Sequence, residues 1–206
     1  MPAVDRKAHW EAIYATRAPQ EVSWYQASPK LSLALIAATG VGNDARIIDV
    51  GGGASTLADH LLDAGFTNLT VLDISATALQ RAQERLGPRA EQVTWIEADI
   101  TAATLPGTYD VWHDRAVFHF LTDPEDRKRY LAAAERALPS GGHLILATFS
   151  LQGPPTCSGL EVVRYSRESL SGELGDRFHL VETREELHRT PRNATQAFLY
   201  ARFRKA

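Results

Sequence analysis

Cysteine is nearly absent from the sequence, because Cys157 is the only one among 206 residues. A single thiol cannot form an internal disulfide and cannot supply a multi-cysteine metal site. No stretch approaches the run of about 18 apolar residues that a membrane-spanning helix needs, and the first residues lack the apolar stretch of a secretory signal peptide. Low cysteine content is typical of reducing compartments, so we expect a cytoplasmic protein that is not inserted in a membrane.

An excess of charge of one sign is also missing. The chain has 22 Lys and Arg against 25 Asp and Glu, a formal net charge of −3, and its basic residues are spread along its length. No basic stripe that could neutralise phosphates is visible, so nucleic acid is not an expected partner. Hydrophobic residues make up 44% of the chain, enough for a sizeable core. We expect a single domain over residues 1–206, with an N-terminal helical cap or lid at 1–43 and the core at 44–206.

Short apolar runs alternate with longer amphipathic segments, without an internal repeat. Strands are predicted at residues 46–50, 69–73, 93–97, 109–113 and 143–149. Helices are predicted at 55–64, 75–86 and 124–138, with Ser55, Ser75 and Asp123 as suitable N-caps. This alternation, with nearly continuous apolar strands, predicts an α/β fold with a doubly wound, mostly parallel sheet covered on both faces.

The two ends of the chain predict additions to this sheet. A helix is expected at 166–174, followed by β-like stretches at 178–188 and 195–203 that a short connection joins. Two adjacent strands of this kind predict an antiparallel hairpin that closes the sheet at one edge. Residues 6–16 and 29–39 are predicted helices, which we expect to cap the carboxyl ends of the strands, where doubly wound sheets bind ligands.

The strongest functional signal is a glycine-rich loop after the first predicted strand. Asp49, Gly51, Gly52 and Gly53 end that strand and lead into a helix. Glycine lets the backbone turn sharply and approach a ligand without a Cβ clash, and free N–H groups at a helix start favour a polar or anionic group. The loop indicates a nucleotide-like ligand, and a plain structural turn is the alternative.

Acidic residues stand at the ends of the next two strands. Asp73, followed by Ile74, lies 24 positions after Asp49, where a carboxylate can accept hydrogen bonds from two ribose hydroxyls. The alternative for Asp73 is a simple helix cap. Asp99 can bond an adenine amino group and Ile100 can cover the ring face, or both can be solvated loop residues.

Acidic residues at three successive strand ends resemble the seven-stranded, Rossmann-like class I methyltransferases. Asp49-x-Gly51-x-Gly53 is similar to their nucleotide loop, and Asp73 and Asp99 match their ribose and adenine positions. The resemblance covers about residues 44–149 and depends on the order and spacing of the motifs. It implies a seven-stranded sheet, S-adenosyl-L-methionine as the cofactor and S-adenosyl-L-homocysteine as its product.

Further segments carry the same resemblance. Tyr109-Asp110-Val111 resembles the fourth strand of the family, and residues 138–144 resemble the turn into its fifth. His9-Trp10-Glu11 with Tyr14 is similar to the opening of small bacterial and mitochondrial members, including some protein-lysine methyltransferases.

The segment from Trp112 to Leu121 leaves the fourth strand where the methyl acceptor is expected. His119 is our candidate general base, and His113 and Arg115 are further catalytic candidates, because imidazole and guanidinium groups transfer protons or orient a polar acceptor. A histidine in an apolar stretch is as often a hydrogen-bonded packing residue. Asp114 is a candidate contact of the methionyl end of the cofactor, and a structural ion pair between Asp114 and Arg115 is the alternative.

Aromatic residues near the N-terminus are candidates for a lid over the sulfonium, because ring faces attract cations. Trp10 and Tyr14 are the expected cofactor contacts, and Trp24 and Tyr25 the expected substrate contacts. Trp10 and Tyr14 lie four residues apart on one helix face, so plain core packing explains them equally well.

Residues 153–165 follow the fifth strand and are expected to line the acceptor pocket. Cys157 and Arg164 are the candidate substrate contacts in this segment. An inert, buried thiol is the default alternative for Cys157.

The expected activity is methylation of a small thiol, amine or carboxylate, with a protein lysine as the alternative acceptor. An NAD(P)-dependent oxidoreductase is a rival, but the third glycine of a dinucleotide loop would fall at Thr56. A non-catalytic nucleotide-binding module is a second rival. No metal is expected. Asp114, His113 and His119 could ligate one, but the carboxylate cluster of metal-assisted methyltransferases is absent from the sequence.

Overall fold

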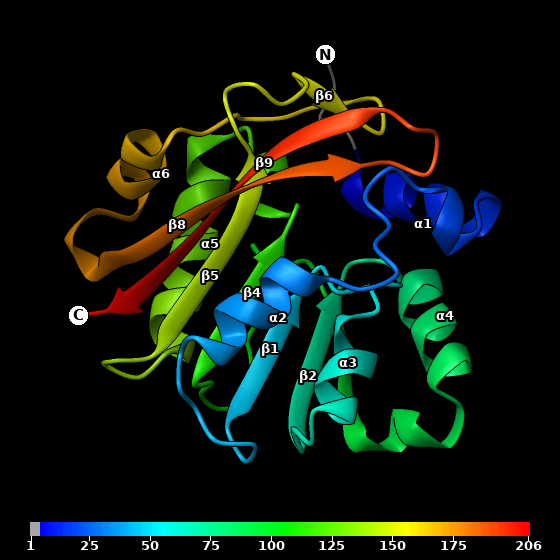
Figure 1. Ribbon diagram of the computed structural model, residues 1–206, viewed down its shortest axis with the longest axis horizontal. Coiled ribbons are helices and arrows are strands. Elements are labelled where there is room, and N and C mark those ends of the chain that lie inside the picture. The colour runs from blue at the N-terminus through cyan, green and yellow to red at the C-terminus, as the bar shows by residue number, and fades with distance from the viewer. Residues whose placement is uncertain (1–4) are drawn as a thin grey trace.

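The computed structural model describes residues 5–206. Its centre is a seven-stranded sheet in the order β3-β2-β1-β4-β5-β9-β8 (Figure 1). These strands are β1 (Arg46–Val50), β2 (Asn68–Asp73), β3 (Val93–Glu97), β4 (Val111–Arg115), β5 (His143–Phe149), β8 (Phe178–Arg189) and β9 (Thr195–Lys205). Strands β1 to β5 pair in parallel, and β9 is antiparallel to both of its neighbours. The predicted doubly wound sheet with a C-terminal antiparallel hairpin is therefore confirmed.

Helices cover both faces of the sheet. One face packs against α2 (Lys30–Ala37), α3 (Leu57–Asp63) and α4 (Ala76–Leu86), and the other against α5 (Pro124–Ala137) and α6 (Arg167–Leu174). Successive side chains of a strand point to opposite faces, so Ile47 joins the first core and Ile48 the second.

Helix α1 (Arg6–Thr16) lies beside α4, at the end of the molecule toward which β1 and β2 point (Figure 1). This is the position predicted for residues 6–16, whereas α2, which was predicted to share it, packs on a face of the sheet beside α3. Short elements complete the fold: η1 (Pro19–Glu21), η2 (Gly87–Gln92), η3 (Phe118–Phe120), η4 (Gly175–Arg177) and a ribbon of β6 (Thr156–Cys157) with β7 (Leu160–Glu161).

Two helix starts follow the predicted capping and one does not. Ser75 Oγ accepts the Ala78 N–H at 3.1 Å, and Asp123 Oδ1 accepts the Glu125 N–H at 2.9 Å, as N-caps do. Helix α3 begins later than predicted, because Ser55 Oγ accepts the N–H of Leu57 and closes a turn before the first helical residue.

Strand β4 begins two residues later than the predicted 109–113. Tyr109 donates its N–H to the carbonyl oxygen of Ala137 at the end of α5, and the register with β1 starts where Val111 lies opposite Ile47. As a result, the segment 113–115 belongs to the strand itself. Because alternate residues face opposite sides, residues 113 and 115 face α2 and residue 114 faces α5.

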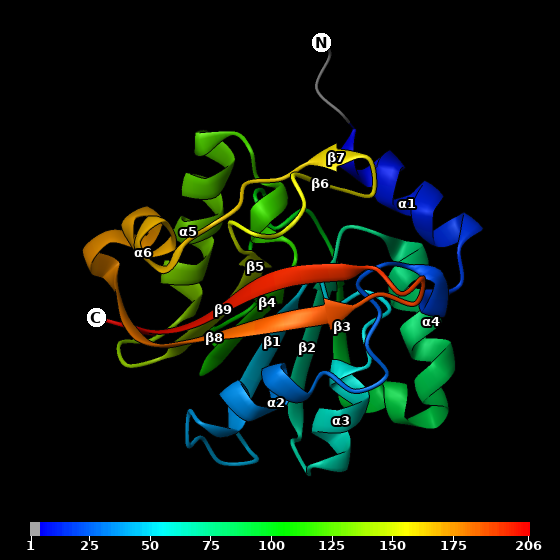
Figure 2. The same ribbon diagram turned by 45° about the horizontal axis from the view of Figure 1, so that its top comes forward.

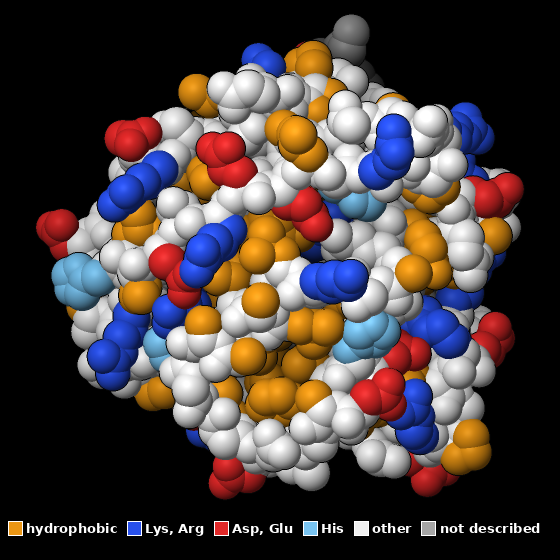
Figure 3. Space-filling view, in the orientation of Figure 1, with side chains coloured by type: hydrophobic (Ala, Val, Ile, Leu, Met, Phe, Trp, Pro, Cys, Tyr) orange, Lys and Arg blue, Asp and Glu red, His pale blue; other side chains and the backbone are white. Residues whose placement is uncertain are grey.

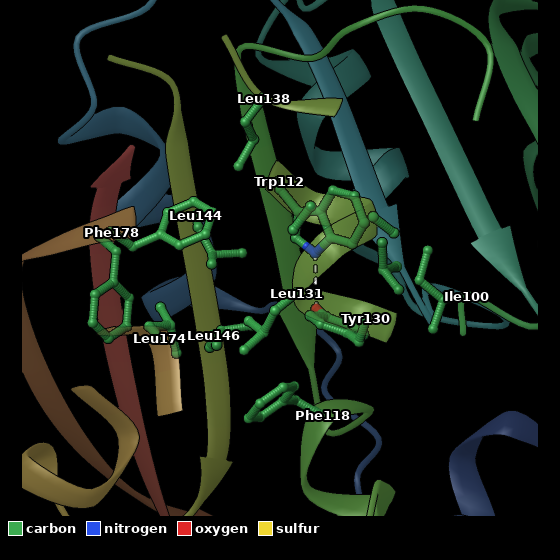
Figure 4. Close-up of a cluster of buried hydrophobic side chains, with 14 of the residues drawn as sticks. Ile100, Trp112, Phe118, Tyr130, Leu131, Leu138, Leu144, Leu146, Leu174 and Phe178 are labelled. Carbon is green, nitrogen blue, oxygen red and sulfur yellow. Dashed lines mark hydrogen bonds between the residues drawn. The ribbon is translucent and has the colours of Figure 1, made fainter. Parts of the chain in front are cut away.

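The core on the α5 side contains a chain of buried hydrogen bonds that anchors β4. Trp112 Nε1 donates to the hydroxyl of Tyr130 at 2.8 Å (Figure 4). That hydroxyl donates to Asp114 Oδ2 at 2.6 Å. Buried polar groups need such partners to offset the loss of water. These two hydrogen bonds therefore fix Asp114 under the loop that follows β4.

The surface agrees with the sequence in its mixture of charges. On the face in Figure 3, Lys and Arg side chains are interspersed with Asp and Glu side chains. Within residues 5–206, no helix has the length and apolar character needed to cross a membrane.

Candidate functional site

A hollow of about 770 Å³, counted to its open mouth, lies at the carboxyl ends of β1, β2 and β4. Ten of the residues predicted for the site line it: Trp10, Tyr14, Trp24, Gly51, Asp73, Ile74, Asp99, Ile100, Arg115 and Cys157. The structure thus brings seven of the predicted cofactor residues to one cavity with Trp24, Arg115 and Cys157, which were predicted for the acceptor side, while Asp49, Gly53 and Asp114 lie outside its lining.

The glycine loop packs tightly enough that side chains are excluded. Gly51 has a φ of +70°, and a Cβ built there would lie 2.0 Å from Val117 Cγ2. Gly53 has a φ of +33°, and its Cβ would lie 2.5 Å from Asp73 Oδ2. Glycine alone tolerates this backbone and this closeness. The loop is therefore held against the β2 carboxylate, as a cradle for a ligand requires.

The surroundings of Asp73 make its carboxylate costly to ionise in the absence of a ligand. Its Oδ1 accepts the Ser75 N–H at 2.8 Å. Burial, together with the negative charges of Asp49 and Glu11, raises the pKa of Asp73 to about 7. A carboxylate that lines a pocket and is costly to ionise fits a ligand that donates hydroxyl hydrogen bonds to it.

The far end of the hollow has a polar edge and an apolar wall. Asp99 Oδ1 accepts from the backbone N–H of Thr101 at 2.9 Å, and Asp99 Oδ2 pairs with Arg6 Nη2 at 3.3 Å. Ile100 is buried and supplies the wall. Arg6 was not predicted from the sequence, because it belongs to α1 and is far from Asp99 along the chain.

The N-terminal aromatic residues line the hollow and also pack on one another. The ring centroids of Trp10 and Trp24 are 5.7 Å apart at 85°, and those of Tyr14 and Trp24 are 6.2 Å apart. Phe120, which was not predicted, faces Trp10 at 5.0 Å. The lid and packing interpretations therefore both describe this cluster.

A second hollow of about 550 Å³ adjoins the first and contains Tyr25. Its lining includes a hydrogen-bonded chain in which Ser32 Oγ lies 2.9 Å from His113 Nε2, and His113 Nδ1 lies 2.7 Å from Asp49 Oδ1. Both ring nitrogens of the buried His113 are thus engaged in orienting Asp49. Ser32 was not predicted as part of the site, because α2 is separated in the sequence from the β1 and β4 residues that Ser32 joins.

Asp114 takes a different position from the predicted cofactor contact. It is fully buried outside the lining of both hollows and accepts the N–H groups of Val117 at 2.9 Å and Phe118 at 3.1 Å. Burial raises the pKa of Asp114 to about 6, against the opposing effect of the Tyr130 hydrogen bond. These contacts hold the loop after β4. Asp114 is therefore an anchor of that loop and not the cofactor contact that was predicted.

His119 does not have the environment of a general base. It is fully buried, and its Nδ1 accepts the backbone N–H of Phe149 at 3.1 Å. Burial and the charge of Arg115 lower the pKa of His119 to about 3. A group with so low a pKa is a poor proton acceptor near neutral pH. The geometry thus favours the packing alternative over the base.

Arg115 occupies the junction of the two hollows. Its Nε donates to the hydroxyl of Tyr200 at 2.8 Å, and its Nη1 donates to the carbonyl oxygen of Trp24 at 2.9 Å. Tyr200 belongs to the long β8–β9 pair, which reaches across to the segment between α1 and α2 (Figure 2). The predicted ion pair of Arg115 with Asp114 is replaced by these contacts, because the two side chains face opposite sides of the sheet.

The two substrate contacts predicted after β5 separate in the structure. Cys157 is buried in the lining of the larger hollow, and burial raises the pKa of its thiol. Arg164 instead donates to the carbonyl oxygens of Leu151 at 3.1 Å and Gly153 at 3.3 Å. It braces the loop that carries Cys157 and lies outside the lining of the hollow.

Residues 48–144 match the protein family described as "Methyltransferase domain". The chain is 26% identical over 144 residues to the eEF1A lysine and N-terminal methyltransferase of Mus musculus, covering 66% of this chain and 20% of that protein. It is 34% identical over 104 residues to the malonyl-[acyl-carrier protein] O-methyltransferase of Anoxybacillus flavithermus (strain DSM 21510 / WK1), covering 50% of this chain and 38% of that one. The chain therefore spans about a fifth and about two fifths of these relatives.

The fold is similar to that of the N-methyltransferase NodS from Bradyrhizobium japonicum WM9 in complex with S-adenosyl-L-homocysteine. The TM-score is 0.73 at 20% identity, and the match covers 98% of this chain and 99% of that one. The glycine loop and Asp73 lie within the matched residues 48–144. Residues 48–144 thus match a methyltransferase domain, and the chain has the fold of a methyltransferase structure that holds S-adenosyl-L-homocysteine.

Proposed function

We propose that this protein transfers a methyl group from S-adenosyl-L-methionine to a small-molecule nucleophile. The observation that carries the proposal is the continuous hollow that joins the strand-end carboxylates to Arg115 and Cys157. One end offers acceptors for nucleoside hydroxyl and amino groups, and the other end offers a cation and a thiol among aromatic rings.

The cofactor would be held by residues that line the two hollows. Asp73 would accept the ribose hydroxyls, and Asp99 with Ile100 would bind the adenine, while Gly51 and the oriented Asp49 would face the methionyl end. The bound cofactor would supply an electrophilic methyl group. The lone pair of the nucleophile would form the new bond as the methyl–sulfur bond breaks, leaving its electron pair on sulfur.

The chain would contribute mainly by alignment and by exclusion of water. Trp10, Trp24 and Phe120 cover the hollow with ring edges and faces, which favours a cationic group and a dry site. Holding two reactants in line supplies much of the acceleration of such a displacement. A general base is not needed when the acceptor arrives deprotonated.

A small acceptor suits a cavity that lies under this aromatic cover. A protein lysine is the alternative, supported by the similarity to the mouse relative over two thirds of this chain. We also propose that the protein works in the cytoplasm as one domain over residues 1–206, with residues 1–43 as its cap, without nucleic acid or a metal.

Calorimetric titration with S-adenosyl-L-homocysteine, with NADH as the control, tests the cofactor assignment. Micromolar binding of the first compound alone is expected. Methyl transfer to small thiols, carboxylates and amines is then compared with transfer to lysine peptides. Cofactor binding without transfer to any acceptor would favour a non-catalytic module, and transfer to peptides alone would favour the alternative.

A further inference from the structure

We propose that Glu186 of β8 is a positioning residue that makes the site prefer the positively charged methyl donor to its neutral product. It acts through Arg115 and Gln26, which hold Trp24 at the point where the sulfonium would lie. This inference rests on the proposed function. It gives the C-terminal hairpin of β8 and β9 a part in discriminating between the two forms of the cofactor.

The two hollows meet at four lining residues that they share, which are Tyr14, Trp24, Gly51 and Arg115. In the cofactor, the sulfonium joins the ribose to the methionyl chain. With the ribose at Asp73 in the larger hollow and the methionyl end in the smaller one, the sulfonium would lie at this junction. The aromatic residues there are Tyr14 and Trp24, and aromatic rings attract a cation that has left water.

Trp24 belongs to a strap, residues 22–29, which contains no helix or strand. Hydrogen bonds from distant parts of the chain hold this strap. Arg115 Nη1 of β4 donates to the carbonyl oxygen of Trp24 at 2.9 Å, and His188 Nε2 of β8 donates to that of Ser23 at 2.7 Å. Because the strap is not part of the sheet, the place of the Trp24 ring depends on these ties to β4 and to the hairpin.

Glu186 connects the ties to one another. Its Oε1 accepts from Gln26 Nε2 of the strap at 3.0 Å, and its Oε2 accepts from the hydroxyl of Tyr200 at 2.9 Å. That hydroxyl accepts from Arg115 Nε at 2.8 Å, and Glu186 Oε2 forms an ion pair with Arg115 Nη2 at 3.8 Å. The carboxylate therefore holds the strap directly at Gln26 and, through the guanidinium, at Trp24.

Glu186 also offsets the charge of Arg115. The side chain of Arg115 is 10% exposed and that of Glu186 is 22% exposed, so water screens the pair only in part. A guanidinium without this partner would repel a sulfonium at the same junction, whereas the sulfur of S-adenosyl-L-homocysteine carries no charge. Glu186 thus favours the donor in two ways, by placing Trp24 and by balancing Arg115.

The ratio of the affinities for S-adenosyl-L-methionine and S-adenosyl-L-homocysteine tests this role. The two compounds differ by the methyl group and its positive charge, so a general loss of structure weakens the binding of both. Calorimetry without a methyl acceptor gives both dissociation constants for each variant. Glu186→Ala removes the carboxylate, and Gln26→Met removes the tie to the strap without changing a charge. Glu185→Ala is the matched control, because it removes an exposed carboxylate from the opposite face of the same strand.

We expect Trp24→Leu and Glu186→Ala each to lower the preference for the donor about fivefold, the size of a cation–π contact at a partly desolvated site. Gln26→Met should lower it about threefold, because Arg115 and His188 still hold the strap. Glu185→Ala should keep the wild-type ratio. Adding Gln26→Met to Trp24→Leu should cause no further fall, because the tie to the strap acts through the Trp24 ring.

The outcomes distinguish this inference from the proposed function. A protein that binds neither compound refutes the proposed function and the inference with it. Binding of both compounds with an unchanged ratio in Glu186→Ala or in Trp24→Leu overturns the positioning role alone, and so does an equal fall in Glu185→Ala. A further fall when Gln26→Met is added to Trp24→Leu overturns the route through Trp24. If Glu186→Ala does not fold, Gln26→Met decides, since a lowered ratio supports the inference and an unchanged one overturns it.

Discussion

We expect Asp73 to make cofactor binding depend on pH near neutrality. Its pKa of about 7 in the free protein means that about 90% of the molecules carry a proton there at pH 6 and about 10% at pH 8. Ribose hydroxyls donate to the ionised carboxylate, so only the unprotonated fraction binds. The dissociation constant for S-adenosyl-L-homocysteine should therefore be about tenfold higher at pH 6 than at pH 8, a difference of about 1.4 kcal/mol.

Calorimetry in buffers of different ionisation enthalpy measures this effect directly. Binding should release about 0.9 proton at pH 6 and about 0.1 at pH 8, because the carboxylate must ionise to bind. In Asp73→Asn the affinity should be lower and should no longer change with pH. Asp99→Asn removes a pocket carboxylate at the adenine end and should keep the pH slope. Equal wild-type affinity at both pH values, with no proton release, would refute the assignment of Asp73 to the ribose.

The remaining predictions concern stability and the loop after β4. Without cofactor, Asp73→Asn should melt at a higher temperature than the wild type at pH 8. The pKa of Asp73 is raised in the folded state, so the wild type loses stability as the pH rises from about 4 to 7. An equal or lower melting temperature of the variant would contradict this. Gly51→Ala should destabilise the protein by about 1–3 kcal/mol and weaken cofactor binding, because of its positive φ and the clash with Val117; urea unfolding checks it, and Val117→Ala in the same chain should recover part of the loss. Asp114→Ala should cost about 3 kcal/mol, because it removes the acceptor of the Tyr130 hydroxyl and of two backbone N–H groups. An unchanged melting temperature would show that these bonds do not anchor the loop.

Local patterns were enough to predict most of the fold and the gathering of the glycine loop and the strand-end carboxylates at one edge of the sheet. The strands at 46–50, 93–97 and 143–149 have the predicted bounds, since short apolar runs between turn residues have few alternatives in a sheet. Gly51 and Asp73 could be placed in one hollow because both lie at a strand end, where the topology of a parallel sheet collects side chains at one edge. The acceptor end could not be predicted in this way.

The tertiary structure decided the roles of the residues after β4. Because β4 starts at Val111, Arg115 faces α2 and Asp114 faces α5. Asp114 therefore bonds to Tyr130 in the core, whereas Arg115 bonds to the carbonyl oxygen of Trp24 beside the hollow. A shift of one residue in register would exchange these faces. The sequence alone did not determine this register, because it depends on how Tyr109 and the end of α5 pack.

The sequence by itself determined the α/β class, the glycine cradle and the strand-end carboxylates, because these depend on local propensity and on the order of the elements. Only the tertiary structure decided that His119 is buried and neutral. That outcome follows from contacts with Phe149 and Phe198, the latter supplied by β9 from the far end of the chain. Desolvation is set by everything that packs around a group, so the protonation state of His119 follows from the assembled fold.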